Sequence, residues 1–155
     1  MRAATDRDVA WIAALAVRHF SATKLPQPNS LGLLEVAYPN LTQVQADLWM
    51  HMQDFSYTTD DGRVFTAKAG TLTDLASIPK AGWNVLPPFG LYTPAAVIHD
   101  DLYRRQIVIK EEADHLFAEM MDCAGVPHDV RMILYDGVKF DGQAAWDRHA
   151  KELGK

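Results

Sequence analysis

The stretch TPAAVIHDDLYRR, in the middle of the chain, constrains the fold most, because it predicts an apolar helix that carries adjacent polar side chains. Thr93 can cap this helix through its hydroxyl, and Pro94 fits the first helical position, where no N–H hydrogen bond is needed. His99 and Tyr103 share one face of the helix, whereas Asp100 is turned away by about 100°. The polar side chains either hold a core together or form a reaction site.

Length and composition fit one globular domain with a sizeable core, since the chain has 155 residues, 48% of them hydrophobic and 23% charged. The formal net charge of -5 is spread along the sequence, and no run of Lys and Arg exceeds the pair Arg104 and Arg105. We therefore expect no nucleic-acid binding. The single cysteine, Cys123, excludes an internal disulfide and is expected to fill core space.

The N-terminal region contains the apolar run VAWIAALAV. Asp6 and Asp8 precede it, where a signal peptide has positive charge, and the run is too short to span a bilayer. We expect neither a signal peptide nor a membrane span. The pattern instead predicts an amphipathic helix over residues 1–22, packed on the protein or docked on a membrane or partner, followed by a single α+β domain over residues 23–155.

The next part of the chain predicts β-structure. LLEVAY is a strand candidate, VQADLWMHMQ is ambiguous between helix and strand, and FSYTTDDGRVFTA predicts a hairpin. In the hairpin, Asp61 and Gly62 form the pair that a two-residue type I′ turn requires.

The C-terminal half predicts helices. IKEEADHLFAEMMDCAG has apolar residues at helical spacing and stops at Gly125, and a second helix opens at Pro127. GQAAWDRHAKELGK is a last short helix or an extension of the second. The fold class is α+β, a small antiparallel sheet with a hairpin followed by a helical C-terminal half. One face of the second helix is expected to carry Val130, Ile133, Leu134 and Val138.

Asp114, on the next predicted helix, forms a candidate polar cluster with His99 and Tyr103. The short connection RRQIVIK makes its helix an antiparallel neighbour of the first, and Phe117 and Met121 share its side, so Asp114 faces inward. An inward carboxylate needs donors, which His99 and Tyr103 supply. A carboxylate bonded to one ring nitrogen fixes the tautomer and leaves the other nitrogen as a general base. A satisfied network that only holds helices in register is the alternative.

Two further acidic or polar positions accompany this cluster. Asp100 could hold a cation that polarises a carbonyl or phosphoryl oxygen. In TDLASIP, Asp74 either caps the turn that begins at Leu75 or approaches His99 as a ligand or orienting group, and Ser77 is a supporting candidate. A Gly- and Pro-rich stretch leads from here to the helix, which favours a functional loop.

The segments TDLASIP, AAVIHDDLY and the Asp-containing EEADHLFAEMMDCAGV resemble a phage and prophage family labelled only as a domain of unknown function, number 1353. The resemblance extends from Phe55 to Trp146. It implies a phage or prophage origin and no particular chemistry.

The HDxxY helix and the later Asp resemble the secreted and parvoviral phospholipases A2. That resemblance implies that His99 is the base that activates water, that Asp100 binds calcium, and that Tyr103 and Asp114 orient His99. PPFGLY stands where a calcium loop is expected, but Gly90 is its only glycine, and the connection between the helices is shorter.

AAVIHDDLY is also similar to the metal helix of HD phosphohydrolases. That resemblance requires further ligands, for which His51, Asp136 and Asp147 are the candidates. Those enzymes are all-helical, whereas a hairpin lies between His51 and His99 here.

These features lead to two functional expectations. The first is a phage-encoded hydrolase with a His-Asp site, with calcium as its candidate cofactor, acting on phospholipid or peptidoglycan of the bacterial envelope. The second is a non-enzymatic virion or tail-associated component, or a protein that binds a host protein or other phage proteins. Both expectations place the protein in the host cytoplasm after synthesis or in the phage virion.

Overall fold

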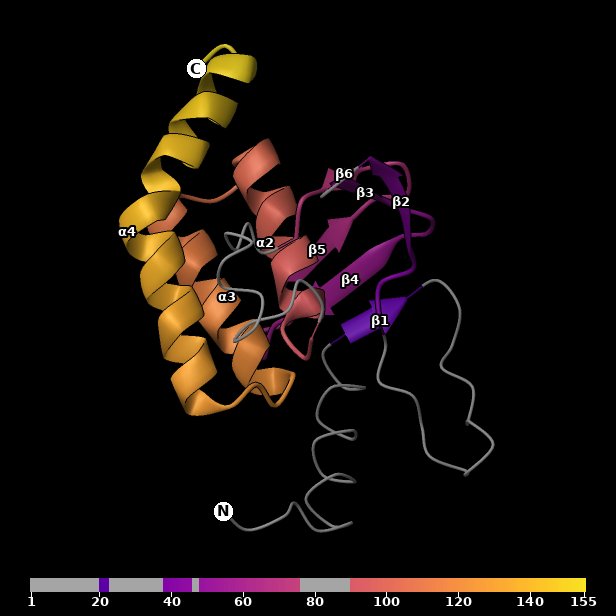
Figure 1. The fold of residues 1–155 in the computed structure, drawn as a ribbon, viewed down its shortest axis with the longest axis vertical. Coiled ribbons are helices and arrows are strands. Elements are labelled where there is room, and N and C mark those ends of the chain that lie inside the picture. Colours follow the sequence, from indigo (N-terminus) through magenta and orange to yellow (C-terminus); the bar gives the residue numbers. More distant parts are fainter. Residues whose placement is uncertain (1–19, 23–37, 46–47, 76–89) are drawn as a thin grey trace, which may run out of the picture.

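The computed structural model describes residues 20–22, 38–45, 48–75 and 90–155 (Figure 1). Strands precede helices along the chain, which confirms the predicted α+β class. The strands are β1 (Phe20–Ala22), β2 (Leu41–Gln45), β3 (Leu48–His51), β4 (Phe55–Thr58), β5 (Val64–Ala67) and β6 (Leu72–Thr73). The helices are α2 (Thr93–Arg105), α3 (Lys110–Cys123) and α4 (His128–Glu152).

The strands form two three-stranded antiparallel sheets, in the orders β1-β4-β5 and β2-β3-β6. Of the ambiguous segment VQADLWMHMQ, Val44 and Gln45 belong to β2 and Leu48–His51 form β3, whereas Met52 and Gln53 follow the strand. LLEVAY lies outside the described residues except for Tyr38, which belongs to no strand. The helix predicted over residues 1–22 also lies outside them, apart from Phe20–Ala22, which pair with β4 as a strand.

The predicted hairpin is confirmed as β4 and β5, but its turn differs from the predicted type I′. Thr59 N–H donates to Arg63 O at 2.9 Å, and Gly62 N–H donates to Thr59 O at 3.0 Å. Gly62 has φ +86°, whereas Asp61 has no positive φ. The loop is therefore a three-residue one with glycine in the left-handed region, because the extra residue Asp60 lets a single glycine absorb the reversal.

The two helices of the predicted site begin and end close to the predicted positions. The Thr93 hydroxyl does not cap α2, because it accepts a hydrogen bond from Gly90 N–H at 2.9 Å, in the segment before the helix. Gln106 ends α2 in the left-handed conformation, with φ 48°. Gly125, with φ 73°, follows α3 and confirms the predicted helix stop.

The last predicted helix is an extension, since α4 is continuous over 25 residues. Leu134 is buried and Val130 and Val138 are partly buried against the core, as predicted. Ile133 is 55% exposed, but it lines the same cavity as Leu134 and Val138, so these three residues share one face of α4 as predicted. Within the described residues, no helix is long and apolar enough to cross a membrane.

Helix α2 lies at the centre of the molecule, between the strands and α4 (Figure 1). It contacts α3 and α4 on one side and strands β4, β5 and β6 on the other. Every residue of α2 from Thr93 to Tyr103 is buried except Asp100. Because α2 is buried, its polar side chains need hydrogen-bond partners within the protein.

Candidate functional site

The Asp114 carboxylate, on α3, collects hydrogen bonds from three side chains. Its Oδ1 lies 3.1 Å from His99 Nε2 and accepts the Tyr103 hydroxyl at 2.6 Å. Its Oδ2 accepts Lys110 Nζ at 2.7 Å. All four residues are buried. Burial alone would raise the pKa of Asp114, but the hydrogen bonds from His99, Lys110 and Tyr103 lower it. The carboxylate is therefore ionised and acts as an acceptor only.

His99 is held as a neutral imidazole. Burial lowers its pKa below the ordinary value of 6.5, against the opposing effect of Asp114 and with a further lowering by the Lys110 charge. Because the Asp114 carboxylate can only accept, Nε2 carries the proton and Nδ1 carries the lone pair. Nδ1 has no hydrogen-bond partner among the described residues. The ring stacks on Phe117 with a centroid distance of 4.6 Å, which fixes its plane.

Tyr103 completes the fixed shell around His99. Burial and then the Asp114 hydrogen bond raise its pKa, so the phenol stays protonated and donates. Its ring lies 4.3 Å from the His99 ring and meets Trp146 edge-on at 5.1 Å. The convergence that the spacing predicts for His99, Tyr103 and Asp114 is thus present in the structure.

Lys110 is the member of the cluster that the sequence analysis missed. It begins α3, it is only 8% exposed, and besides Asp114 it donates to the Val138 carbonyl of α4 at 3.0 Å. A Lys four residues before an Asp on one helix is a recognisable pairing. That spacing usually describes an exposed surface pair, however, so burial of the pair is visible only in the fold.

Gly142 of α4 is a second residue that the sequence analysis missed. A Cβ at this position would lie 2.6 Å from the Tyr103 hydroxyl oxygen. Because Gly142 has no side chain, α4 can approach the Tyr103 hydroxyl, which donates its hydrogen bond to Asp114. In the sequence, a glycine within an amphipathic helix does not indicate which side chain of another helix will pack against it.

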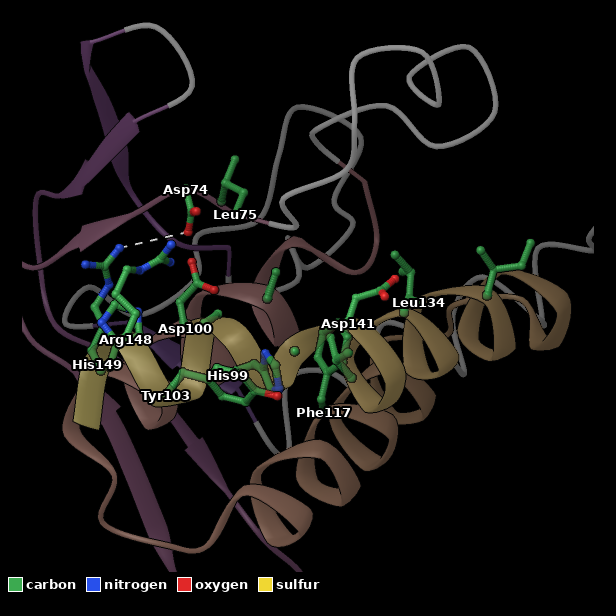
Figure 2. Close-up of a pocket in the computed structure, with 17 residues that line it drawn as sticks. Asp74, Leu75, His99, Asp100, Tyr103, Phe117, Leu134, Asp141, Arg148 and His149 are labelled. Carbon is green, nitrogen blue, oxygen red and sulfur yellow. Dashed lines mark ion pairs between the residues drawn. The ribbon is translucent and has the colours of Figure 1, made fainter. Parts of the chain in front are cut away.

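A cavity of about 430 Å³ opens beside His99, between α2 and α4. Figure 2 shows His99 and Tyr103 at its wall, with Asp141 opposite on α4. Asp74 and Leu75 border it from the end of the strand region. The α4 wall consists of Ile133, Leu134, Gly137, Val138, Asp141, Gly142, Ala145, Arg148 and His149.

Asp100 and Asp74 lie together at one edge of the cavity. The Thr73 hydroxyl donates to Asp100 Oδ2, and Asp74 Oδ1 lies 3.9 Å from Arg104 Nη2. Burial, and then the charge of Asp74, raises the pKa of Asp100 well above its ordinary value. Asp74 lines the same cavity as His99.

The backbone N–H of Leu75 donates to the Thr73 hydroxyl at 3.0 Å, and the N–H groups that a cap by Asp74 would reach, at residues 76 and 77, lie outside the described residues. Leu75 itself is buried with a positive φ of 60°, a strained conformation for a leucine at the cavity edge. Ser77, the other supporting candidate, lies outside the described residues.

Asp100 and Asp74 have the donor chemistry of the calcium site that the phospholipase resemblance implies. The described residues contain no group of three or more His, Cys, Asp or Glu side chains that could hold a metal ion. Two carboxylates supply only part of the six to eight oxygen ligands that calcium takes, and residues 87–89 of the expected calcium loop PPFGLY lie outside the described residues.

The ligand set of HD phosphohydrolases is not brought together. His51 is buried in β3, and neither it nor Asp136 or Asp147 lines the cavity beside His99. Asp147 instead accepts a hydrogen bond from Gln143 on its own helix. The resemblance is limited to the helix that carries His99.

Fold and site together define an α+β protein with a buried His-Asp pair at the wall of a helix-lined cavity. The chain belongs to a family described as protein of unknown function (DUF1353), whose model matches residues 49–138. The matched region contains His99, Tyr103, Lys110 and Asp114, as well as the hairpin. No curated protein and no solved structure matches the chain.

Proposed function

We propose that this protein is a hydrolase in which His99 is the general base. One observation carries the proposal: the His99 imidazole is neutral, its Nε2–H is bonded to an ionised Asp114, and its Nδ1 is left without a described partner at a cavity wall. A base needs a lone pair, a fixed tautomer and room for substrate, and His99 meets all three requirements.

The reaction follows from these contacts. A water molecule in the cavity gives a proton to Nδ1 as its oxygen attacks the carbonyl carbon of an ester. The imidazolium that forms is stabilised by Asp114, whose charge lies 3.1 Å from Nε2. The tetrahedral intermediate then breaks its bond to the leaving oxygen, which takes the proton back from Nδ1. Tyr103 and Lys110 hold the carboxylate in place throughout and take no part in proton transfer.

The substrate that we propose is a phospholipid of the bacterial envelope, with peptidoglycan as second choice. The cavity supports this order, because much of its α4 wall is apolar or small, as at Leu134, Val138 and Ala145. An apolar wall suits an acyl chain better than a glycan or a peptide. We further propose a phage or prophage origin and a place in the host cytoplasm or the virion, on the sequence resemblance described above.

A non-enzymatic role in a phage particle is the second candidate, and one observation favours it. Through Lys110, the cluster ties three helices together, since Nζ donates both to Asp114 and to the backbone of Val138. Polar networks of this kind can serve to hold helices in register. In this role His99 would support Asp114 and no substrate would enter.

The experiment compares wild type with His99→Gln and with a matched control, His51→Gln. His51 is also a buried histidine, but it does not line the cavity. Fatty-acid release from phospholipid vesicles and solubilisation of peptidoglycan are measured with calcium and with a chelator, beside thermal melts of all three proteins.

We expect His99→Gln to lower turnover by about 100-fold or more, the usual contribution of a general base. His51→Gln should keep its turnover per folded molecule. The hydrolase is contradicted if the wild-type protein is inert on both substrates under both conditions and the His99→Gln variant only melts earlier. That result would favour the structural role.

A further inference from the structure

The cavity has two chemically different ends along α4. Leu134 and Ile133 lie toward the start of the helix, and Arg148 and His149 lie near its end, 14 residues or about 21 Å further on. Figure 2 shows Leu134 and His149 at opposite ends of the α4 wall, with His99 between them. A ligand that fills the cavity therefore meets apolar side chains at one end and cations at the other.

The basic end is formed by two arginines from different helices. Arg104 of α2 and Arg148 of α4 both line the cavity, and the charges of both help to lower the pKa of Glu152, after the stronger effect of the His149 hydrogen bond. The two guanidinium groups thus act on the same carboxylate and converge on one end. His149 is already engaged, with Nδ1 2.9 Å from Glu152 Oε2.

These guanidinium groups keep unused donors. Arg148 is exposed and forms no hydrogen bond with another described residue. The Nε of Arg104 is buried without a hydrogen-bond partner in the described part of the chain, and its Nη2 is 3.9 Å from Asp74, beyond hydrogen-bond distance. Guanidinium groups with free N–H donors are the preferred partners of phosphate groups.

The apolar end is formed where α2 and α4 face each other before His99. Ala96 lies three residues before His99 on α2, and Phe117 stacks on the His99 ring. Ile133 and Leu134 stand opposite on α4, and Ile133 is half exposed at the rim. An exposed aliphatic side chain at the rim of a cavity is suited to contact with a hydrocarbon chain.

We propose that the cavity binds an anionic amphiphile lengthwise, with its phosphate on Arg148 and Arg104 and its acyl chain along Leu134 and Ile133. This inference rests on the proposed function, and it places the ester that joins chain and head group beside His99. It also selects phospholipid over peptidoglycan as the substrate class.

Carboxylates partly offset the charge of the basic end. Asp74 forms an ion pair with Arg104 at 3.9 Å, and Glu152 is bonded to His149, whereas Asp100, whose pKa burial raises, accepts from Thr73. Asp141 stands nearer the middle of the α4 wall, two turns before Arg148 (Figure 2). Arg148 is thus the cation best placed to receive the phosphate.

The test measures binding by calorimetry and uses probes that the proposed hydrolase cannot cleave. Dodecyl phosphate, below its micelle concentration, has the chain and the anion but no carboxylic ester. Dodecyl maltoside supplies a chain without charge, and glycerol phosphate supplies the anion without a chain. We expect dodecyl phosphate to bind at least about tenfold more tightly than either, because both ends of the cavity then contribute.

Two variants and a control test which residues contact the phosphate and which contact the alkyl chain. Arg148→Gln should weaken dodecyl phosphate binding about tenfold, which is the low end for a charge-assisted hydrogen bond, and leave dodecyl maltoside binding unchanged. Ile133→Asn should weaken both alkyl probes. Lys151→Gln removes an exposed cation of the same helix that does not line the cavity, and should bind all probes as wild type does.

The outcomes separate this inference from the hydrolase itself. Equal binding of dodecyl phosphate and glycerol phosphate, or an Arg148→Gln variant that binds like wild type, would overturn the lengthwise site even where ester hydrolysis is found. Conversely, if the protein shows the expected binding pattern but hydrolyses no ester, the lengthwise binding site is supported and the proposed hydrolase activity is contradicted.

Discussion

Two buried histidines, one in each half of the molecule, have different surroundings. His51 of β3 is 1% exposed and His99 of α2 is 5% exposed, and burial lowers the pKa of both. Neither ring nitrogen of His51 has a hydrogen-bond partner in the described part of the chain, whereas Nε2 of His99 is bonded to Asp114. Of the two, only His99 borders the cavity.

The contrast between the two histidines shows that burial favours the neutral imidazole but is not sufficient for a general base. A base also needs a carboxylate that fixes the tautomer and an open space in front of the second nitrogen. In the helical half, α3 supplies the carboxylate and α4 forms the wall of a cavity that His99 lines, and the described part of the sheet half supplies neither to His51.

Replacing Asp114 by Ala should destabilise the protein by about 3–5 kcal/mol, because the Lys110 cation would remain buried without its carboxylate. Urea unfolding measures the loss. The double variant Asp114→Ala with Lys110→Met should recover part of the stability, since no unpaired charge stays buried, but none of the proposed turnover. A single variant as stable as wild type would mean that the cluster is not the centre of the helical half.

Gly142→Ala should destabilise by about 1–3 kcal/mol, because the new methyl group must displace the Tyr103 hydroxyl from 2.6 Å. Gly137→Ala is the matched control on the same helix, since no neighbouring group lies within 4 Å of the place that its methyl group would take. It should gain up to about 1 kcal/mol from helix propensity. Thermal melts that rank the two variants in the opposite order would contradict the close approach of α4 to Tyr103.

The stability contributed by His51 and His99 should fall as the pH decreases below about 6.5, the ordinary histidine pKa, whereas Asp100, whose pKa is raised in the folded protein, acts in the opposite direction. His51 and His99 have lowered pKa values in the folded protein, so between the unfolded and the folded pKa only the unfolded chain binds the proton. Their contribution is complete above the unfolded pKa and is lost toward acid, at up to about 1.4 kcal/mol per pH unit for each residue.

Urea unfolding from pH 7.5 to pH 5 measures this dependence. The His51→Gln variant should lose less stability than wild type over the same interval, because one of the two groups no longer titrates. Parallel curves for the two proteins would show that burial of His51 does not depress its pKa.

Gly62→Ala is expected to have the smallest effect, a loss of about 1 kcal/mol, because a side chain is strained at φ +86° although no atom lies within 4 Å. Gly62 belongs to the hairpin turn and not to the cavity, so turnover per folded molecule should be unchanged. A change in turnover without a change in stability would mean that the sheet half influences the site.

Local patterns are sufficient to predict much of the helical half. The i, i+4 spacing of His99 and Tyr103 and the short connection to Asp114 are enough to bring the three side chains together, because each relation spans few residues. The hairpin is predictable for the same reason. Its turn type is not, because Asp-Gly is compatible with both a two-residue and a three-residue loop.

Periodicity and short connections act over a few residues, and they are sufficient to predict most of the helices and the nearest polar contacts. Tertiary structure decided that Lys110 is buried, that Gly142 admits Tyr103 and that Arg148 and Arg104 line the same cavity. These contacts all require the position of α4, which lies far along the chain from α2. The apolar spacing of Leu134 and Val138 indicates which face of α4 is buried, but which residues of α2 and α3 that face meets depends on the packing of all the helices at once.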